Sequence, residues 1–205
     1  MLVRLRSFTS GQRRFETLVD GYALVLAETA GALIGAFSSS AGDPRHVVIK
    51  QNKTRADALS RALRTRSARR WSAPDERIAV FALLDALDSA MADIDRAART
   101  ALGVETDPAL GELERALIDA IDVVAAALPF LRSTSTYRPQ LRLAATDIAK
   151  LGERAAALHV GGLRALSRAS PDAAELAVRH DIYARLECIR HRLTEAGIAI
   201  ERLPG

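Results

Sequence analysis

Cysteine, aromatic residues and long hydrophobic runs are all scarce in this sequence of 205 residues. The single cysteine, Cys188, excludes an internal disulfide framework and a cysteine-based zinc cluster. The most apolar stretches, 22–37 and 116–130, are short and interrupted by carboxylates, so neither predicts a transmembrane helix. The N-terminus also lacks the uninterrupted apolar segment of a secretory signal. We therefore expect a cytoplasmic protein.

Glycine and proline are sparse as well, with 12 and 7 residues. In their place the chain has 39 alanines and 27 leucines, which are strong helix formers. This composition excludes collagen and argues against an all-β fold or a disordered chain. It predicts an all-α protein.

Capping residues mark the expected helix starts. Asp43–Pro44, Asp107–Pro108 and Ser170–Pro171 each place a capping residue before a proline, and Ser72 to Asp75 resembles a capping box. Apolar residues recur at helical spacing between these marks, so the two signals together predict six helices. Pro129 should kink or end the fourth helix. The predicted helices cover residues 12–38, 44–67, 73–102, 108–132, 138–168 and 171–199.

The connections between these helices are short, so consecutive helices should pack antiparallel as a bundle. Helix lengths roughly repeat after the third helix, which suggests an internal duplication. We expect a single domain, 1–205, built of two antiparallel three-helix pseudo-repeats at about 12–102 and 108–199. Within the first repeat, the second and third helices should bring Asp57 close to Asp88.

Positive charge is concentrated in one segment, although the net charge is only +4. The run from Lys50 to Arg70 holds eight Lys or Arg residues and a single acid. We interpret it as a solvated helix face, with a nucleic-acid or anionic-lipid surface as the alternative. If this run binds a partner, we expect Arg61, Arg64 and Arg66 to make the contact.

Several polar residues stand where a helix bundle normally places apolar ones. Asp88 lies four residues after Leu84 and three before Met91, so it points toward a helix interface. Glu187 and His191 are four residues apart beside the last apolar stripe. This spacing can aim two ligands at one metal ion, although interfacial acids more often pair with arginine.

Short motifs around these residues resemble a known family. They are Pro74-Asp75-Glu76-Arg77, Leu87-Asp88 with Ile94 to Ala98, Asp181 to Glu187, Ala56-Asp57 and the apolar pattern of 151–166. Together they resemble the PhoU-like phosphate-transport regulators, in the branch often encoded beside a Pit-type inorganic phosphate transporter. The resemblance covers residues of about 13 to 202. It implies two three-helix repeats, which the capping pattern also predicts.

The resemblance further implies acid–x–x–x–Asp motifs that hold multinuclear metal clusters on the second and third helices of each repeat. In the first repeat the chain keeps Asp57 and Asp88, but Lys53 replaces the acid four residues before Asp57. Hard cations need several oxygen ligands, and a lysine places positive charge where a ligand should be. We therefore expect the first metal site to be empty.

The second repeat departs from the motif in a different way. Its fifth-helix pair is Gly152 and Ala156 rather than two acids, whereas Glu187 is kept. His191 and His159 could join Glu187 around one weakly bound borderline metal. The alternative interpretation is three ordinary polar residues at a helix interface, which are more common than ligands.

Three functional classes fit these observations. The resemblance implies a non-enzymatic regulator or accessory protein of inorganic phosphate transport, which associates with a phosphate permease or a phosphate-signalling protein. The second class is a metal-binding helical bundle, but none of the four histidines has a glutamate three residues before it, as ferritin-type enzymes require. The third is a basic nucleic-acid-binding adaptor, supported only by the run 50–70.

We predict the first class, because the sequence contains no phosphate-binding glycine loop, nucleophile elbow or Ser/His/Asp grouping. This hypothesis requires no catalytic residue, no cofactor and no nucleic acid, and it places the protein at a membrane only through a partner. It is compatible with a homo-oligomer and with a single weakly bound divalent metal.

Overall fold

The computed structural model describes residues 2–38, 43–70, 74–101, 108–169 and 172–203, with side chains described except at 2–13 and 68–70. Over these ranges the chain is helical and contains no strand, which confirms the predicted fold class. None of the described helices is both long and apolar enough to cross a membrane. The helices are α1 (Leu2–Leu33), η1 (Ala36–Ser38), α2 (Pro44–Arg70), α3 (Pro74–Thr100), α4 (Pro108–Ala127), η2 (Leu128–Arg132), α5 (Arg138–Ala169) and α6 (Ala173–Glu201), where η1 and η2 are short 3-10 helices.

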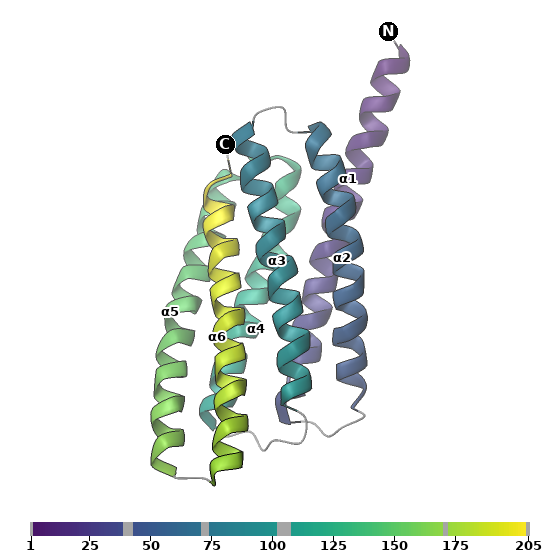
Figure 1. The fold of residues 1–205 in the computed structure, drawn as a ribbon. Coiled ribbons are helices and arrows are strands. Elements are labelled where there is room, and N and C mark those ends of the chain that lie inside the picture. The colour runs from purple at the N-terminus through teal and green to yellow at the C-terminus, as the bar shows by residue number, and fades with distance from the viewer. Residues whose placement is uncertain (1, 39–42, 71–73, 102–107, 170–171, 204–205) are drawn as a thin grey trace.

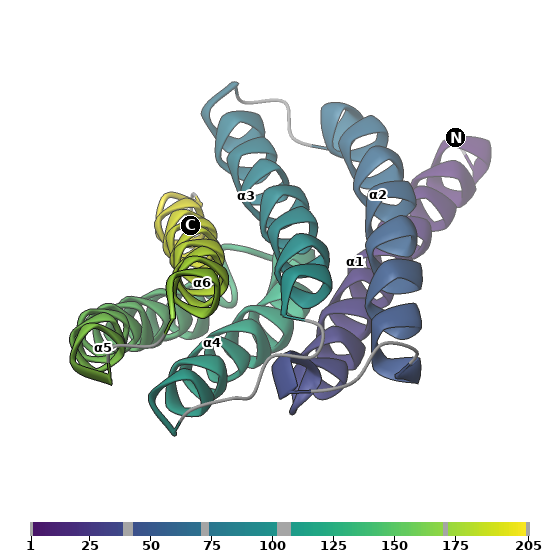
Figure 2. The ribbon, with the colours of Figure 1, turned by 60° about the horizontal axis from the view of Figure 1, so that its bottom comes forward.

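Consecutive α-helices run antiparallel and form two three-helix units, α1–α3 and α4–α6 (Figure 1). Seen from one end, the six helices lie in two rows, with α1, α4 and α5 in one row and α2, α3 and α6 in the other (Figure 2). The units are joined where α3 packs along α6 and α1 packs along α4. Their buried apolar side chains form one continuous cluster, so the two units share a core.

Capping and proline residues account for the beginning of three helices. The Asp43 carboxylate accepts a hydrogen bond from the Arg45 backbone N–H at 2.8 Å and so satisfies a donor in the first turn of α2. Helices α3 and α4 begin with Pro74 and Pro108. Proline fits this position because the missing N–H has no partner within the helix there. The predicted capping residues before α3 and α4 lie outside the described residues.

The last helix begins two residues later than predicted. Asp172 is its N-cap, and the Asp172 carboxylate accepts a hydrogen bond from the Glu175 backbone N–H at 2.8 Å. Helix α6 therefore starts at Ala173 rather than at residue 171. The cap that the sequence suggested, Ser170, lies outside the described residues.

Helix α1 extends from Leu2 to Leu33 rather than over 12–38. Its earlier end has a local cause, because Gly35 has φ 67°, a left-handed conformation that ends an α-helix. The prediction for Pro129 is confirmed, since α4 ends at Ala127 and the chain continues as η2. Proline lacks the N–H that the next α-helical hydrogen bond would need.

Helices α5 and α6 approach closely because glycine lies at their contact. The Tyr183 ring packs against Gly162, where a Cβ atom would overlap the ring. Tyr183 is buried, and its ring meets the His159 imidazole edge-on with centroids 5.9 Å apart. This contact fixes the position of His159 beside α6.

A buried carboxylate, Glu114 of α4, ties the second unit to the turn between α1 and α2. Its side chain accepts a hydrogen bond from the Gly35 backbone N–H at 2.8 Å, and the residue is 6% exposed. Arg45 holds the same turn by donating to the Ile34 carbonyl at 2.7 Å. Burial raises the pKa of Glu114 to about 7, against smaller opposing effects of the Gly35 N–H and the nearby Arg45 and Arg115 charges.

The substitution Glu114→Gln should remove a pH dependence of stability. Because its pKa is raised in the folded state, Glu114 stabilises the fold below about pH 4.5, and this contribution is lost as the pH rises through about 7. The glutamine side chain can still accept a hydrogen bond from the Gly35 backbone N–H, and it carries no charge at any pH. At pH 8 the variant should exceed the wild type in free energy of unfolding by about 2–3 kcal/mol, and near pH 4 the two should agree.

Urea unfolding at both pH values measures this difference. Glu112→Gln, at an exposed position of the same helix, is the matched control and should leave both values unchanged. A difference between Glu114→Gln and wild type that is equal at the two pH values would contradict the prediction.

Candidate functional site

Asp88 of α3 lies at the junction of the three helices of the first unit. Its carboxylate accepts hydrogen bonds from Tyr22 Oη of α1 at 3.1 Å, Ser60 Oγ of α2 at 2.7 Å and Arg64 Nη2 of α2 at 2.9 Å. Tyr22 is fully buried, and burial together with the charge of Asp88 raises the pKa of the Tyr22 hydroxyl well above its usual range. The hydroxyl is therefore a neutral donor, and a single carboxylate connects α1, α2 and α3.

Arg64 forms ion pairs with two carboxylates. In addition to its bond with Asp88, its Nη2 lies 2.9 Å from Asp85 Oδ1. The guanidinium also lies over the Phe81 ring, 5.9 Å from the ring centroid. Arg64 is thus committed to contacts within the first unit.

Asp57 belongs to the same region of the first unit. Lys53, one turn before it on α2, donates to Asp57 Oδ2 at 2.6 Å. The charges of Asp57 and Asp88 both raise the pKa of the Tyr22 hydroxyl, so the two predicted acids lie near the same buried group. We call Lys53, Asp57, Ser60, Arg64, Asp85, Asp88 and Tyr22 the first cluster.

Glu187 of α6 is the centre of a second cluster. Arg190 donates to both Glu187 oxygens, from Nε at 2.8 Å and from Nη2 at 2.6 Å. His191 Nε2 lies 3.2 Å and His159 Nδ1 lies 4.0 Å from the Glu187 carboxylate. Hydrogen bonding from Arg190 is the main cause that lowers the pKa of Glu187. The structure therefore brings Glu187, His191 and His159 together, as predicted. Arg190, however, already binds the Glu187 carboxylate that the two histidines face.

Neither cluster fits a metal centre of the kind that the resemblance implies. Within the ranges that the structure describes, no group of three or more His, Cys, Asp or Glu side chains is placed to hold a metal ion. In both clusters the carboxylate oxygens already accept hydrogen bonds from cationic side chains. A metal would have to displace a guanidinium or ammonium group whose own charge opposes it.

Of the donors in these clusters, the sequence identifies Lys53 beside Asp57 but not Tyr22, Ser60 or Arg190. Tyr22 falls on the apolar stripe of α1 and looked like an ordinary core residue. The pairing of Arg190 with Glu187 could have been predicted, since the two residues are three apart, a spacing at which helical side chains pair. The burial of Glu114, outside both clusters, could also have been predicted, because it stands between Leu110 and Leu117 on the buried stripe of α4.

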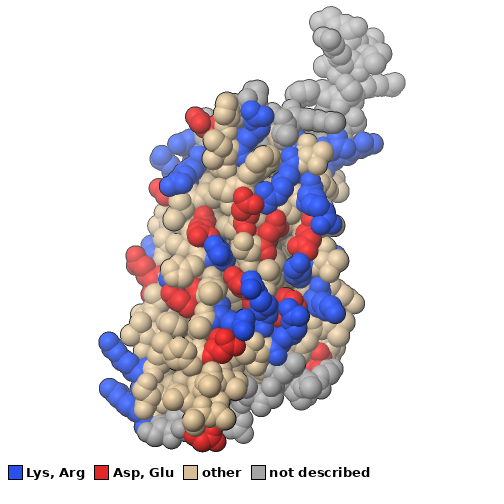
Figure 3. Space-filling model, in the orientation of Figure 1, with Lys and Arg blue, Asp and Glu red and all other residues tan. Residues whose placement is uncertain are grey.

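The basic run of α2 is used partly inside the molecule. Arg55 forms an ion pair with Glu28 of α1, and Arg64 belongs to the first cluster. Arg61 is exposed and Arg66 half-exposed, and no ion pair joins either of them to another described residue. Of the three arginines expected to contact a partner, Arg64 is therefore the least available. On the face formed by α2, α3 and α6, acidic and basic side chains are intermingled (Figure 3).

The substitution Asp88→Ala should destabilise the protein by about 2 kcal/mol, because it leaves the buried Tyr22 and Ser60 hydroxyls without their acceptor and leaves Arg64 with Asp85 alone. Urea unfolding at neutral pH measures the loss. Glu153→Ala, at an exposed position of α5, is the control and should change stability by less than about 0.5 kcal/mol. Equal effects of the two substitutions would show that the contacts of Asp88 contribute little to the free energy of unfolding.

The purified protein should contain less than one tightly bound transition metal per chain, because cationic side chains neutralise the acids of both clusters. Elemental analysis of protein purified without chelator measures the content, and a stoichiometric multinuclear cluster would overturn the prediction. If a single metal is found instead, we expect Glu187 and His191 among its ligands, and His191→Ala should release it.

No family model and no curated protein matches this sequence. Among solved structures, the chain is similar to the crystal structure of a protein assigned as a PhoU-like phosphate regulatory protein from Shewanella oneidensis MR-1. The two sequences are 15% identical, the match covers 94% of this chain and 96% of the other, and the TM-score is 0.62. The likeness spans both three-helix units. The chain therefore has the six-helix fold of a PhoU-like protein.

Proposed function

We propose that this protein is a non-enzymatic regulator or accessory protein of inorganic phosphate transport that acts by binding another protein. The observation that carries the proposal is the likeness to the PhoU-like phosphate regulatory protein over 94% of the chain. The sequence motifs described above point to the same family independently. Its partner in this hypothesis is a phosphate permease of the Pit type or a phosphate-signalling protein.

The chemistry of the two clusters supports association rather than catalysis. An active site needs groups that are free to take up a proton, attack a substrate or stabilise developing charge. Here the acids of the first cluster bind Lys53 and Arg64, and Glu187 binds Arg190. Of these pairs, Arg64–Asp88 joins α2 to α3, whereas the other two lie within α2 and within α6. All of them occupy the acids, which leaves the exposed helix faces as the parts that can recognise a partner.

We assign partner binding to the surface of α2 around Arg61 and Arg66. Both side chains reach solvent, and no described acid forms an ion pair with either. Surface cations of this kind attract an acidic cytoplasmic loop or helix, and the attraction weakens as salt screens it. Arg64 is left out of this surface because its charge is neutralised by Asp85 and Asp88.

Co-purification with a Pit-type phosphate permease from the same cells tests the proposal. The wild-type chain should retain the permease at low salt and lose it as salt rises. The double variant Arg61→Ala/Arg66→Ala should weaken retention by about fivefold, since exposed ion pairs contribute up to about 1 kcal/mol. It should unfold at the same urea concentration as the wild type.

The matched control is Arg142→Ala/Arg154→Ala, which removes two exposed charges from α5 and should leave retention unchanged. Recovery of neither a permease nor a phosphate-signalling protein would contradict the proposed function. A hydrolase or ferroxidase activity of the pure protein that Asp88→Asn abolishes would revive the enzyme class instead.

A further inference from the structure

The hairpin of α5 and α6 projects past the ends of the neighbouring helices (Figure 1). The two helices pack antiparallel, so the last turns of α5 lie beside the first turns of α6. Every residue of 172–178 is exposed. Three large apolar side chains in this part of the hairpin reach solvent, with Val160 46%, Leu176 39% and Val178 41% exposed. The hairpin end is therefore an apolar surface that the chain itself only partly covers.

A basic groove of about 550 Å³ lies on the α5 side of this hairpin end. Its lining combines apolar walls with cations, and no carboxylate is among the lining residues that the structure describes, which are His159, Val160, Leu163, Arg164, Ser167 and Arg168. Arg164 and Arg168 are one helical turn apart and exposed, and no ion pair joins either of them to another described residue. In Figure 3 the lower end of the molecule is mostly uncharged, with basic side chains projecting from its α5 side.

The acids near the hairpin end are already satisfied within α6. Glu175 pairs with Arg179 at 2.7 Å, and Asp181 pairs with Arg185 at 2.9 Å. Asp172 is the N-cap of α6, where the positive end of the helix dipole stabilises its charge. The two cations of the groove on α5 therefore remain available to an anionic ligand.

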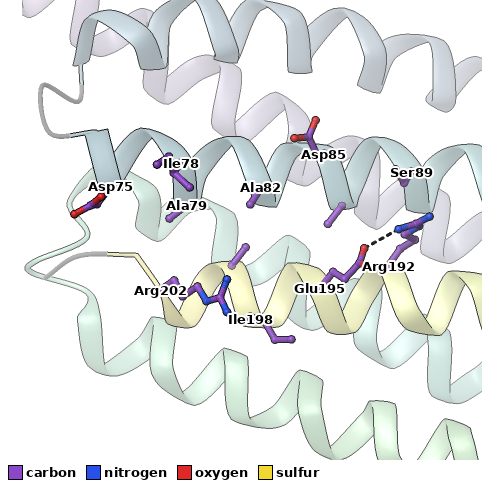
Figure 4. Close-up of a pocket in the computed structure, with 12 residues that line it drawn as sticks. Asp75, Ile78, Ala79, Ala82, Asp85, Ser89, Arg192, Glu195, Ile198 and Arg202 are labelled. Atoms are coloured by element: carbon purple, nitrogen blue, oxygen red, sulfur yellow. Dashed lines mark hydrogen bonds and ion pairs between the residues drawn. The ribbon is translucent and has the colours of Figure 1, made fainter.

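A larger groove, of about 640 Å³, lies between α3 and α6 (Figure 4), but most of its charged residues are paired inside the chain. Asp85 pairs with Arg64, whereas Arg192 pairs with Glu195 at 2.9 Å and lies 3.8 Å from Asp93. That groove therefore presents little free charge to an ionic ligand.

We propose that the end of the α5–α6 hairpin binds the surface of a bilayer that contains anionic phospholipid. The guanidinium groups of Arg164 and Arg168 bind lipid phosphates, whose oxygens suit bidentate hydrogen bonds from arginine. Val160, Leu176 and Val178 enter the headgroup region, where apolar side chains gain by leaving water. An acidic protein loop or a free phosphate ion would occupy the arginines but would leave the apolar side chains in water. A projecting end that carries both kinds of side chain favours the bilayer.

Co-sedimentation of the purified chain with vesicles tests the proposal. The wild type should bind vesicles of phosphatidylglycerol and phosphatidylcholine in equal parts, should not bind pure phosphatidylcholine, and should be released as salt rises. Arg164→Ala/Arg168→Ala should weaken binding by about twentyfold, because each arginine near an anionic surface strengthens binding by about fivefold. The variant should unfold at the same urea concentration as the wild type.

The matched control is Arg142→Ala/Arg154→Ala, which removes two exposed arginines from the same helix. Arg154 precedes Arg164 by about 15 Å along the helix axis, more than the Debye length of about 10 Å at 0.1 M salt. The control should therefore leave vesicle binding unchanged. Equal losses in the two double variants, or a wild type that does not bind the anionic vesicles, overturn the proposal.

The apolar part of the contact is tested by Leu176→Ala/Val178→Ala, which keeps good helix formers in α6. This variant should weaken vesicle binding by about fivefold at each salt concentration, because salt does not screen apolar contacts. Leu143→Ala, at a 61% exposed site on α5, is the control and should bind as the wild type does. Unchanged binding by the α6 double variant would show that the hairpin end does not enter the headgroup region, and it overturns the proposed contact.

Competition separates a lipid surface from a free phosphate ion as the ligand of the groove. Sodium phosphate and sodium chloride at equal ionic strength should release the wild type from the vesicles equally, because both act by screening. Stronger release by phosphate would mean that the groove binds the ion itself, and it contradicts docking on lipid.

This inference goes beyond the proposed function and does not depend on it. The proposed function brings the chain to a membrane through a partner, whereas the contact inferred here is direct and needs no other protein. A chain that retains the permease but does not bind the vesicles overturns the lipid contact alone. A chain that binds the vesicles but recovers neither a permease nor a phosphate-signalling protein contradicts the proposed function alone.

Discussion

The ion pair between Arg64 and Asp88 is the contact on which the first three-helix unit depends. Asp88 is the common acceptor for side chains from α1 and α2, and Arg64 carries the positive charge that makes a carboxylate tolerable at a helix junction. Without that charge, Asp88 would be a partly buried anion beside the further negative charge of Asp85. The arrangement of α1, α2 and α3 therefore requires a cation at this point, and an arginine of the chain supplies it.

The second unit meets the same requirement differently. Arg190 lies on the same helix as Glu187 and neutralises it along α6, whereas Arg64 reaches across from α2 to α3. His159 approaches Glu187 from α5, but its nitrogen stands 4.0 Å away. Interhelical contact in this unit comes instead from close packing of Tyr183 against Gly162. The first unit thus adds a charged network to its share of the apolar core, whereas the second unit relies on close apolar packing between α5 and α6.

The high alanine content has consequences for both packing and surface. Small side chains let α3 and α6 approach each other, which joins the two units into one core. The same small side chains leave a groove beside the contact, because alanine is too short to fill it. Glu114 adds a polar link between the units, and its titration near neutrality makes that link sensitive to pH. In the function that we propose, recognition of a partner depends on exposed helix faces and on the charges along them.

The local features of the fold followed from the sequence alone. Alanine and leucine content, helical spacing and capping prolines act within one or two turns. They are sufficient for the all-α class, for the starts of α2, α4 and α5, and for the start of α3 within one residue. The predicted end of α1 and the predicted start of α6 were wrong, because each depends on a single residue, the left-handed Gly35 and the N-cap Asp172. Both are local features, but several residue types could have served at each position.

The partners of the acids were decided by the tertiary structure. The sequence singled out Asp88 and Glu187 as polar residues at helix interfaces, and it weighed arginine against metal as their partner. It did not show that Arg64 and Arg190 are the arginines concerned, or that Glu114 is buried. A carboxylate pairs with whichever cation the rotation and axial position of the helices bring within about 3 Å, and these are fixed only when the whole core packs.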